Sequence, residues 1–211
     1  MSTLVDKIVQ AIRGDIYNGT LHPGFPLKQV ELANRYGVSP IPLREALQRL
    51  QMEGLVEYFA YRGAIVARLR LAEARDIADI RNALEALAFK IAVPTLDEEQ
   101  LQRLERVTNE LESPKSYQNA AFFLEKIMEY FTVLLANSNR PLLLEMIHTN
   151  LKGAVRYYAE LLRRRDGSPL EAPSRLDYLA AIRADDVPGL LKMMEARHAA
   201  YVAAFDTFLE E

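Results

Sequence analysis

One arginine in the first third of the chain, Arg44, has the chemistry and the setting of a residue that reads a DNA base. A guanidinium can donate two hydrogen bonds to O6 and N7 of guanine, and such a pair supplies about 1–3 kcal/mol of discrimination. Ser39 stands where the main-chain N–H groups of a helix start would bind a phosphate. Lys28, Gln29 and Arg49 are candidate contacts to the DNA backbone. The alternative for these side chains is an ordinary solvated position, and for Arg44 a pairing within its own helix.

Helices and a hairpin are needed to position these residues. Apolar periodicity and turn residues predict helices over 4–18, over 29–36 and from near 42, followed by strands over 55–58 and 64–67. Gly37 stops the second helix, and Ser39 is placed to cap the third. With a helix-turn-helix at about 29–48, this is the outline of a winged helix, which places one helix in the DNA major groove.

Composition and charge favour a protein of the cytoplasm that is not an enzyme. The 211 residues carry a net charge of −3 and no cysteine, which excludes disulfides, thiolate metal sites and cysteine nucleophiles. No apolar run reaches the roughly 18–20 residues of a membrane span, and the N-terminus does not look like a secretory signal, so we expect no membrane partner. Three scattered histidines, without a Ser/His/Asp set or a glycine-rich phosphate loop, do not support catalysis.

The remaining two-thirds of the chain has the pattern of a separate helical domain. Helices are predicted at about 71–93, 97–112, 116–137, 140–165, 170–184 and 187–209. Six helices with short loops make an antiparallel bundle. The predicted fold is therefore mostly α, with a winged helix-turn-helix over 1–68 and an all-helical domain over 71–211. Residues 1–68 contain eight Lys/Arg and six Asp/Glu, an excess of only two, so DNA affinity depends on where the cations lie or on pairing two such domains in a dimer.

The N-terminal motifs closely resemble the GntR winged-helix family. In order along the chain, they are Gly19-x-Leu21-x-Pro23-Gly24, Glu31-Leu32-Ala33, Tyr36-Gly37-Val38-Ser39, Pro42-Leu43-Arg44-Glu45-Ala46-Leu47, Glu53-Gly54-Leu55-Val56 and Arg62-Gly63. Downstream, the pattern over 76–88 and the run over 181–186 resemble the FCD effector domain of the FadR subgroup, and six helices are similar to its VanR type.

The resemblance implies a dimeric, cytoplasmic transcription factor, most often a repressor, that binds a palindromic double-stranded operator. It implies a small metabolite, often a carboxylate, in the FCD domain. At the wing tip it implies that Arg62 reaches the minor groove, where Gly63 allows close approach. One segment departs from the family. The usual Ser-Arg-Thr-Pro is replaced by Ser39-Pro40-Ile41-Pro42, which removes one cation and one donor, although Ile41 could touch a thymine methyl. We therefore expect a different operator, or weaker binding to each half-site.

The family's metal site also departs from the usual pattern. Many FCD domains hold a divalent metal with an Asp and a His spaced i, i+4 and two further His. The corresponding positions here carry Ile127, Phe131 and Arg175, and only His198 could serve as a ligand. An aliphatic side chain, a phenyl ring and a guanidinium cannot hold zinc or nickel. We therefore predict no metal and no other cofactor.

These replacements suggest a partly apolar cavity for an organic acid. Ile127 and Phe131 would supply apolar walls, and a guanidinium can clamp a carboxylate. The candidate polar partners of the ligand are Arg81, Arg156, Arg175, His198, Tyr130, Tyr157 and Tyr178. Each is alternatively a surface charge or a core residue, and Arg81 is alternatively the i, i+4 partner of Glu85. The remaining alternative is an effector-independent regulator whose closed pocket serves only dimerisation.

Overall fold

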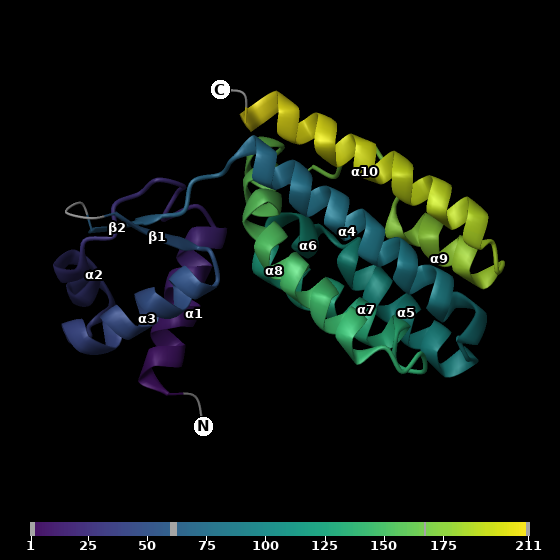
Figure 1. Cartoon of the computed structure of the whole chain (residues 1–211), viewed down its shortest axis with the longest axis horizontal. Helices are drawn as coiled ribbons and strands as arrows, with labels where there is room; N and C mark the ends of the chain where they lie inside the picture. Colours follow the sequence, from purple (N-terminus) through teal and green to yellow (C-terminus); the bar gives the residue numbers. More distant parts are fainter. Residues whose placement is uncertain (1–2, 60–62, 167, 210–211) are drawn as a thin grey trace. The chain divides into compact units, whose positions relative to one another are not determined.

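The computed structural model describes residues 3–59, 63–166 and 168–209, in two compact units that divide between Leu69 and Arg70 (Figure 1). Across these residues it contains ten α-helices and one two-stranded sheet, so the predicted mostly α fold is confirmed. None of the described helices is long and apolar enough to cross a membrane. Each unit is described by itself below.

The first unit is built on the packing of α1 (Leu4–Tyr17) against α3 (Pro40–Met52). One face of α1 is buried, and its residues are Ile8, Val9, Ile12, Ile16 and Tyr17. Thr3 begins the helix by accepting a hydrogen bond from the main-chain N–H of Asp6, whose carboxylate accepts one from the N–H of Thr3. The predicted first helix is therefore confirmed to within one residue.

The helix-turn-helix consists of α2 (Gln29–Tyr36) and α3. α2 ends because Gly37 adopts a left-handed φ of 64°, which a residue without a Cβ adopts at little cost. α3 begins at Pro40, two residues before the predicted start near Pro42. Both prolines fit the first turn, since the N–H groups they lack have no partner within a helix at that point.

The hairpin pairs β1 (Val56–Phe59) with β2 (Gly63–Val66) in antiparallel register. The sequence pattern places each strand one residue away from these bounds. The first strand starts late because Leu55 still donates its main-chain N–H to the carbonyl of Leu50 at the end of α3. No other strand is present in the described ranges.

The second unit is an all-helical bundle (Figure 1). Its elements are α4 (Leu71–Ala92), the 3-10 turn η1 (Val93–Thr95), α5 (Glu98–Leu111), α6 (Pro114–Gln118), α7 (Ala120–Leu134), α8 (Pro141–Arg164), α9 (Arg175–Arg183) and α10 (Val187–Leu209). α4 packs against both α8 and α10. The ring of Phe89 on α4 lies within 6.2 Å of the rings of Tyr130, Phe131 and Tyr178, and these aromatic contacts fill the core of the bundle.

Two of the helices predicted for this bundle differ from the structure by more than one residue, and the described part of the bundle has seven α-helices where six are predicted. The segment 116–137, predicted as one helix, is divided at Asn119 into α6 and α7. Asn119 is extended, with φ −140° and ψ 98°, and its side chain accepts a hydrogen bond from the N–H of Phe122, which starts a new helix. The helix predicted from residue 170 begins at Arg175, because Ser174 forms a capping box at that point.

Candidate nucleic-acid interface and ligand cavity

The exposed side of α3 carries the residues predicted to read DNA. Its buried side consists of Leu43, Ala46, Leu47 and Leu50. Arg44 and Gln48 lie one turn apart on the exposed side, and Ile41 is 74% exposed. Within the described residues Arg44 makes no ion pair, so the alternative pairing along its own helix does not form. Burial raises the pKa of Tyr58 on β1, and the positive charge of Arg44 acts to lower that pKa. Arg44 therefore interacts electrostatically with the hairpin.

Ser39 is the N-cap residue of α3, as predicted, but its side chain makes no capping hydrogen bond. A cap hydroxyl accepts from the N–H two or three positions further on. The first and third residues of α3 are Pro40 and Pro42, which have no N–H. Ile41, the second residue, therefore carries the only N–H of the first three helical positions. The Ser39 hydroxyl and the Ile41 N–H therefore remain available to a phosphate.

Two of the side chains predicted to contact the DNA backbone form ion pairs with surface carboxylates. Lys28 Nζ lies 2.9 Å from Glu31 Oε1, and Arg49 Nη1 lies 2.7 Å from Asp6 Oδ1. Exposed pairs of this kind contribute little, so a DNA phosphate can compete for either cation. Gln29, the first residue of α2, is half-buried.

At the wing, the structure describes only one of the two predicted contact residues. Gly63 begins β2 with a φ of 79°, a left-handed value that explains why glycine stands there. Arg62 lies outside the described residues. Among the described residues, the predicted base contacts therefore lie in the first two turns of α3.

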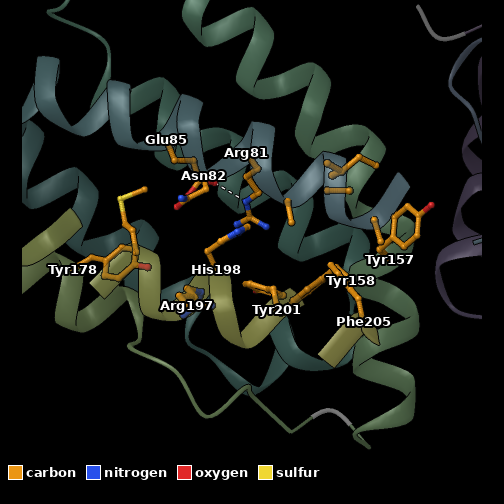
Figure 2. Close-up of a pocket in the computed structure, with 15 residues that line it drawn as sticks. Arg81, Asn82, Glu85, Tyr157, Tyr158, Tyr178, Arg197, His198, Tyr201 and Phe205 are labelled. Carbon is orange, nitrogen blue, oxygen red and sulfur yellow. Dashed lines mark hydrogen bonds and ion pairs between the residues drawn. The ribbon is translucent and has the colours of Figure 1, made fainter. Parts of the chain in front are cut away.

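The second unit contains a cavity, partly open to solvent, among α4, α8, α9 and α10 (Figure 2). Its polar lining consists of Arg81, Asn82, Glu85, Tyr178, Arg197 and His198. The rest of the lining consists of the small and apolar residues Ala74, Ile77, Ala78, Ala154, Met194 and Phe205 and the rings of Tyr157, Tyr158 and Tyr201. Figure 2 shows Tyr157, Tyr158 and Phe205 together on one side of Arg81, and Tyr178 and Arg197 on the other. The cavity is therefore amphipathic.

Two guanidinium groups face one phenol ring in this cavity. The Cζ atoms of Arg81 and Arg197 each lie 5.6 Å from the ring centre of Tyr201. Burial acts to raise the pKa of Tyr201, but the charges of Arg197, Arg81 and Arg175 outweigh it and hold that pKa below its ordinary value. Burial raises the pKa of Tyr178 to about 12. The electrostatic potential beside Tyr201 is therefore positive, which favours the binding of an anion.

Glu85 is the buried carboxylate of the cavity. It accepts a hydrogen bond of 2.7 Å from Arg81 Nε, the i, i+4 pairing that the spacing allows. Burial acts to raise the pKa of Glu85, but Arg81 and Arg175 hold it below its ordinary value, so the carboxylate is charged. At the same cavity, His198 Nε2 lies 3.0 Å from Oδ1 of the exposed Asp79.

The predicted ligand residues divide into two groups. Arg81, Tyr157, Tyr178 and His198 line the cavity; Ile127, Tyr130, Phe131, Arg156 and Arg175 do not. Tyr130 and Phe131 are buried instead because their rings pack around Phe89 in the core. Ile127 is fully buried as well, and Arg156 forms an ion pair with Glu73.

Sequence reasoning missed Arg197, Glu85 and Tyr201 as cavity residues. The sequence predicts Glu85 only as the i, i+4 partner of Arg81 and assigns no role to Arg197 or Tyr201. The available signal is the spacing of four residues from Arg197 to Tyr201 and from Tyr201 to Phe205, which puts all three on one face of α10.

The positions that hold a metal in related FCD domains do not fit one in this chain. Ile127 and Phe131 have no donor atom, and Arg175 is a buried guanidinium. In the described ranges, no group of three or more His, Cys, Asp or Glu is arranged to hold a metal ion.

Comparison with known proteins identifies both units. A family model described as bacterial regulatory proteins of the gntR family matches residues 4–66, and an FCD domain model matches residues 76–200. The chain belongs to the GntR family. This GntR chain is 36% identical over 97 residues to the uncharacterized HTH-type transcriptional regulator YdhC of Bacillus subtilis (strain 168), covering 46% of the chain and 43% of YdhC.

A second relative is the HTH-type transcriptional repressor RspR of Escherichia coli (strain K12). The identity is 33% over 100 residues, covering 47% of this chain and 44% of RspR. The chain thus spans less than half the length of these two curated relatives. The solved structure of E. coli McbR/YncC has the same fold, with a TM-score of 0.69 at 22% identity, covering 98% of this chain and 99% of that one. YdhC and RspR are named as transcriptional regulators, and the gntR family is described as one of bacterial regulatory proteins.

Proposed function

We propose that this GntR chain is a DNA-binding transcription regulator that acts in the cytoplasm as a dimer and represses its target genes. The observation that supports this proposal is the exposed side of α3. Among the described residues Arg44 makes no ion pair there, and it lies near Ile41 and near Ser39, whose side chain makes no capping hydrogen bond. Two copies of this surface, related by a two-fold axis, would read a palindromic double-stranded operator. Repression is supported by the name of the E. coli relative.

Gel shifts with genomic fragments upstream of its own gene, at several salt concentrations, test the DNA-binding proposal. Arg44→Met is expected to weaken specific binding about 5- to 150-fold per half-site, which corresponds to about 1–3 kcal/mol. Lys7→Met removes an exposed cation from α1 and is the matched control, expected to have a smaller effect. The absence of any salt-sensitive, sequence-specific shift would reject DNA binding. Equal losses for the two variants would reject base reading by Arg44.

The cavity in the second unit supports an amphipathic organic acid as the effector. The guanidinium groups of Arg81 and Arg197 face the ring of Tyr201 and repel each other. Glu85 is the only carboxylate among the described residues of the cavity lining, and it balances only part of the positive charge of the two arginines. A ligand carboxylate placed beside Tyr201 would accept charge-assisted hydrogen bonds from these guanidinium groups. The apolar part of the lining, which includes Phe205, would cover the rest of the molecule.

Thermal melting with benzoate, hexanoate and succinate tests the effector, with benzyl alcohol as the uncharged counterpart of benzoate. A ligand that binds the folded state raises the melting temperature by mass action. We expect benzoate and hexanoate to stabilise the chain, benzyl alcohol to have no effect, and Arg197→Met to remove the response. Arg106→Met, on the exposed side of α5, is the control and should respond as the wild type. If no acid stabilises the protein, the alternative of an effector-independent regulator is favoured.

An exposed apolar stripe on α4 and α8 supports the dimer. Ile80 and Leu87 are 51% and 47% exposed on α4, and Leu142 and Met146 are 68% and 49% exposed on the adjoining α8. Burying such side chains against a second copy is favourable. Sedimentation should show a dimer that Ile80→Glu with Met146→Glu converts to a monomer, while Leu176→Glu, exposed on α9, leaves it intact. A monomeric wild type would reject this surface.

A further inference from the structure

Among the described residues, the buried guanidinium of Arg175 makes no hydrogen bond. The side chain is 1% exposed, and within the described residues its Nε, Nη1 and Nη2 have no hydrogen-bond partner. Its guanidinium lies 5.3, 6.0 and 5.8 Å from the ring centres of Tyr130, Phe131 and Tyr178. These rings give it cation–π contacts but no acceptor, and a buried charge without one is unfavourable.

Among the described residues, the carboxylate nearest to the Arg175 guanidinium, that of Glu85, is bonded to a different arginine. Glu85 Oε2 lies 3.8 Å from Arg175 Nη2, too far for a hydrogen bond, while Glu85 Oε1 accepts from Arg81 Nε at 2.7 Å. A displacement of about 1 Å would bring Glu85 to the distance of a charge-assisted bond with Arg175. Glu85 and Arg81 line the cavity, whereas Arg175 does not. Glu85 therefore lies between one arginine that a ligand can reach and one that a ligand cannot.

We propose that Glu85 is a transferable counterion: it pairs with Arg81 in the ligand-free protein, and an anionic ligand at Arg81 moves it onto Arg175. This rests on the proposed anionic effector. The transfer gives the buried nitrogens of Arg175 an acceptor. It also joins α4 to the first residue of α9, so that binding in the cavity acts on a helix through a residue that the ligand does not touch. An uncharged analogue, which cannot compete with Glu85 for Arg81, does not cause the transfer.

Arg81→Met tests the transfer without any ligand, because it removes the partner that holds Glu85. The N–H signal of Arg175 Nη2, the nitrogen nearest to Glu85, in proton–nitrogen NMR spectra at low temperature, assigned with Arg175→Lys, is the readout. We expect it to move downfield and exchange more slowly with water in Arg81→Met, and to return when Glu85→Gln is added. An Arg175 signal that is the same in wild type and Arg81→Met overturns the proposal. If Arg81→Met does not fold, Arg81→Gln is measured in its place with the same expectations.

Benzoate binding by calorimetry tests the transfer in the presence of a ligand. Arg175→Met should weaken benzoate binding about tenfold, since the displaced Glu85 then has no new partner. Tyr130→Phe, which removes a buried hydroxyl beside Arg175, is the matched control and should bind as the wild type. Unchanged binding by Arg175→Met overturns the transfer and leaves the effector proposal intact. If the wild type binds no acid, the effector proposal fails, and the ligand-free measurement alone decides whether Glu85 transfers.

Discussion

Replacing Ser39 with alanine should leave the stability of the first unit almost unchanged, although Ser39 is the cap residue of α3. A cap serine that makes its hydrogen bond contributes about 0.5–2 kcal/mol relative to alanine. The side chains of Thr3 and Ser174 accept from the N–H of the third helical residue, which Pro42 lacks at the corresponding position of α3. Ser174, which accepts from the N–H of Asp177 at 3.2 Å, is the matched control. We expect Ser39→Ala to lower the free energy of unfolding by less than about 0.5 kcal/mol, and Ser174→Ala by about 1 kcal/mol.

Pro42→Asp completes the test, because it restores the N–H and introduces the acidic partner that Thr3 has in Asp6. With Pro42→Asp in place, Ser39→Ala should cost about 1 kcal/mol. Urea unfolding followed by circular dichroism gives the free energies, and hydrogen exchange at α3 and α9 assigns each change to its unit. The reasoning is refuted if Ser39→Ala alone costs 1 kcal/mol or more, or if it costs nothing in the Pro42→Asp protein.

Three further substitutions test the core, the turn and the buried carboxylate. Phe89→Ala should destabilise the second unit by about 3–5 kcal/mol in urea unfolding, because the ring is fully buried among aromatic neighbours. Gly37→Ala should cost about 1 kcal/mol, from its φ of 64° alone, since a Cβ there would meet no atom within 4 Å. The pKa of Glu85 is lowered from an unfolded value near 4.5, so its stabilisation is complete above that pH and lost as pH falls through the lower folded pKa. Glu85→Gln should therefore show a smaller loss of melting temperature than the wild type on acidification below about pH 4.5, and equal losses would contradict this.

The sequence predicts most helices well but not the break at Asn119. Ser116, Ala120, Phe123, Ile127 and Tyr130 are all buried and keep helical spacing across that break. The apolar pattern is therefore the same for one helix as for two, and only the extended backbone and the capping bond of Asn119 distinguish them.

The cavity was harder to predict than the DNA-reading helix. The position of Arg44 follows from local features, since a stop at Gly37 and one turn of helix determine its exposure. The cavity depends on which side chains the long helices bury. Phe131 packs against Phe89 in the core, and Arg197 on α10 lines the cavity together with residues of α4. In both cases the residues that meet are far apart in the sequence.

The lowered pKa of Tyr201 predicts an ultraviolet absorbance change that reports whether the cavity is occupied. The chain has ten tyrosines and no tryptophan, so its near-ultraviolet absorption comes mainly from phenol rings. Among the tyrosines that line the cavity, Tyr201 has a lowered pKa while burial raises those of Tyr157, Tyr158 and Tyr178. On alkaline titration its phenolate should therefore form first within the cavity, and an acid bound beside it should delay that change. Occupancy of the cavity can then be followed by ultraviolet difference spectroscopy without any attached dye.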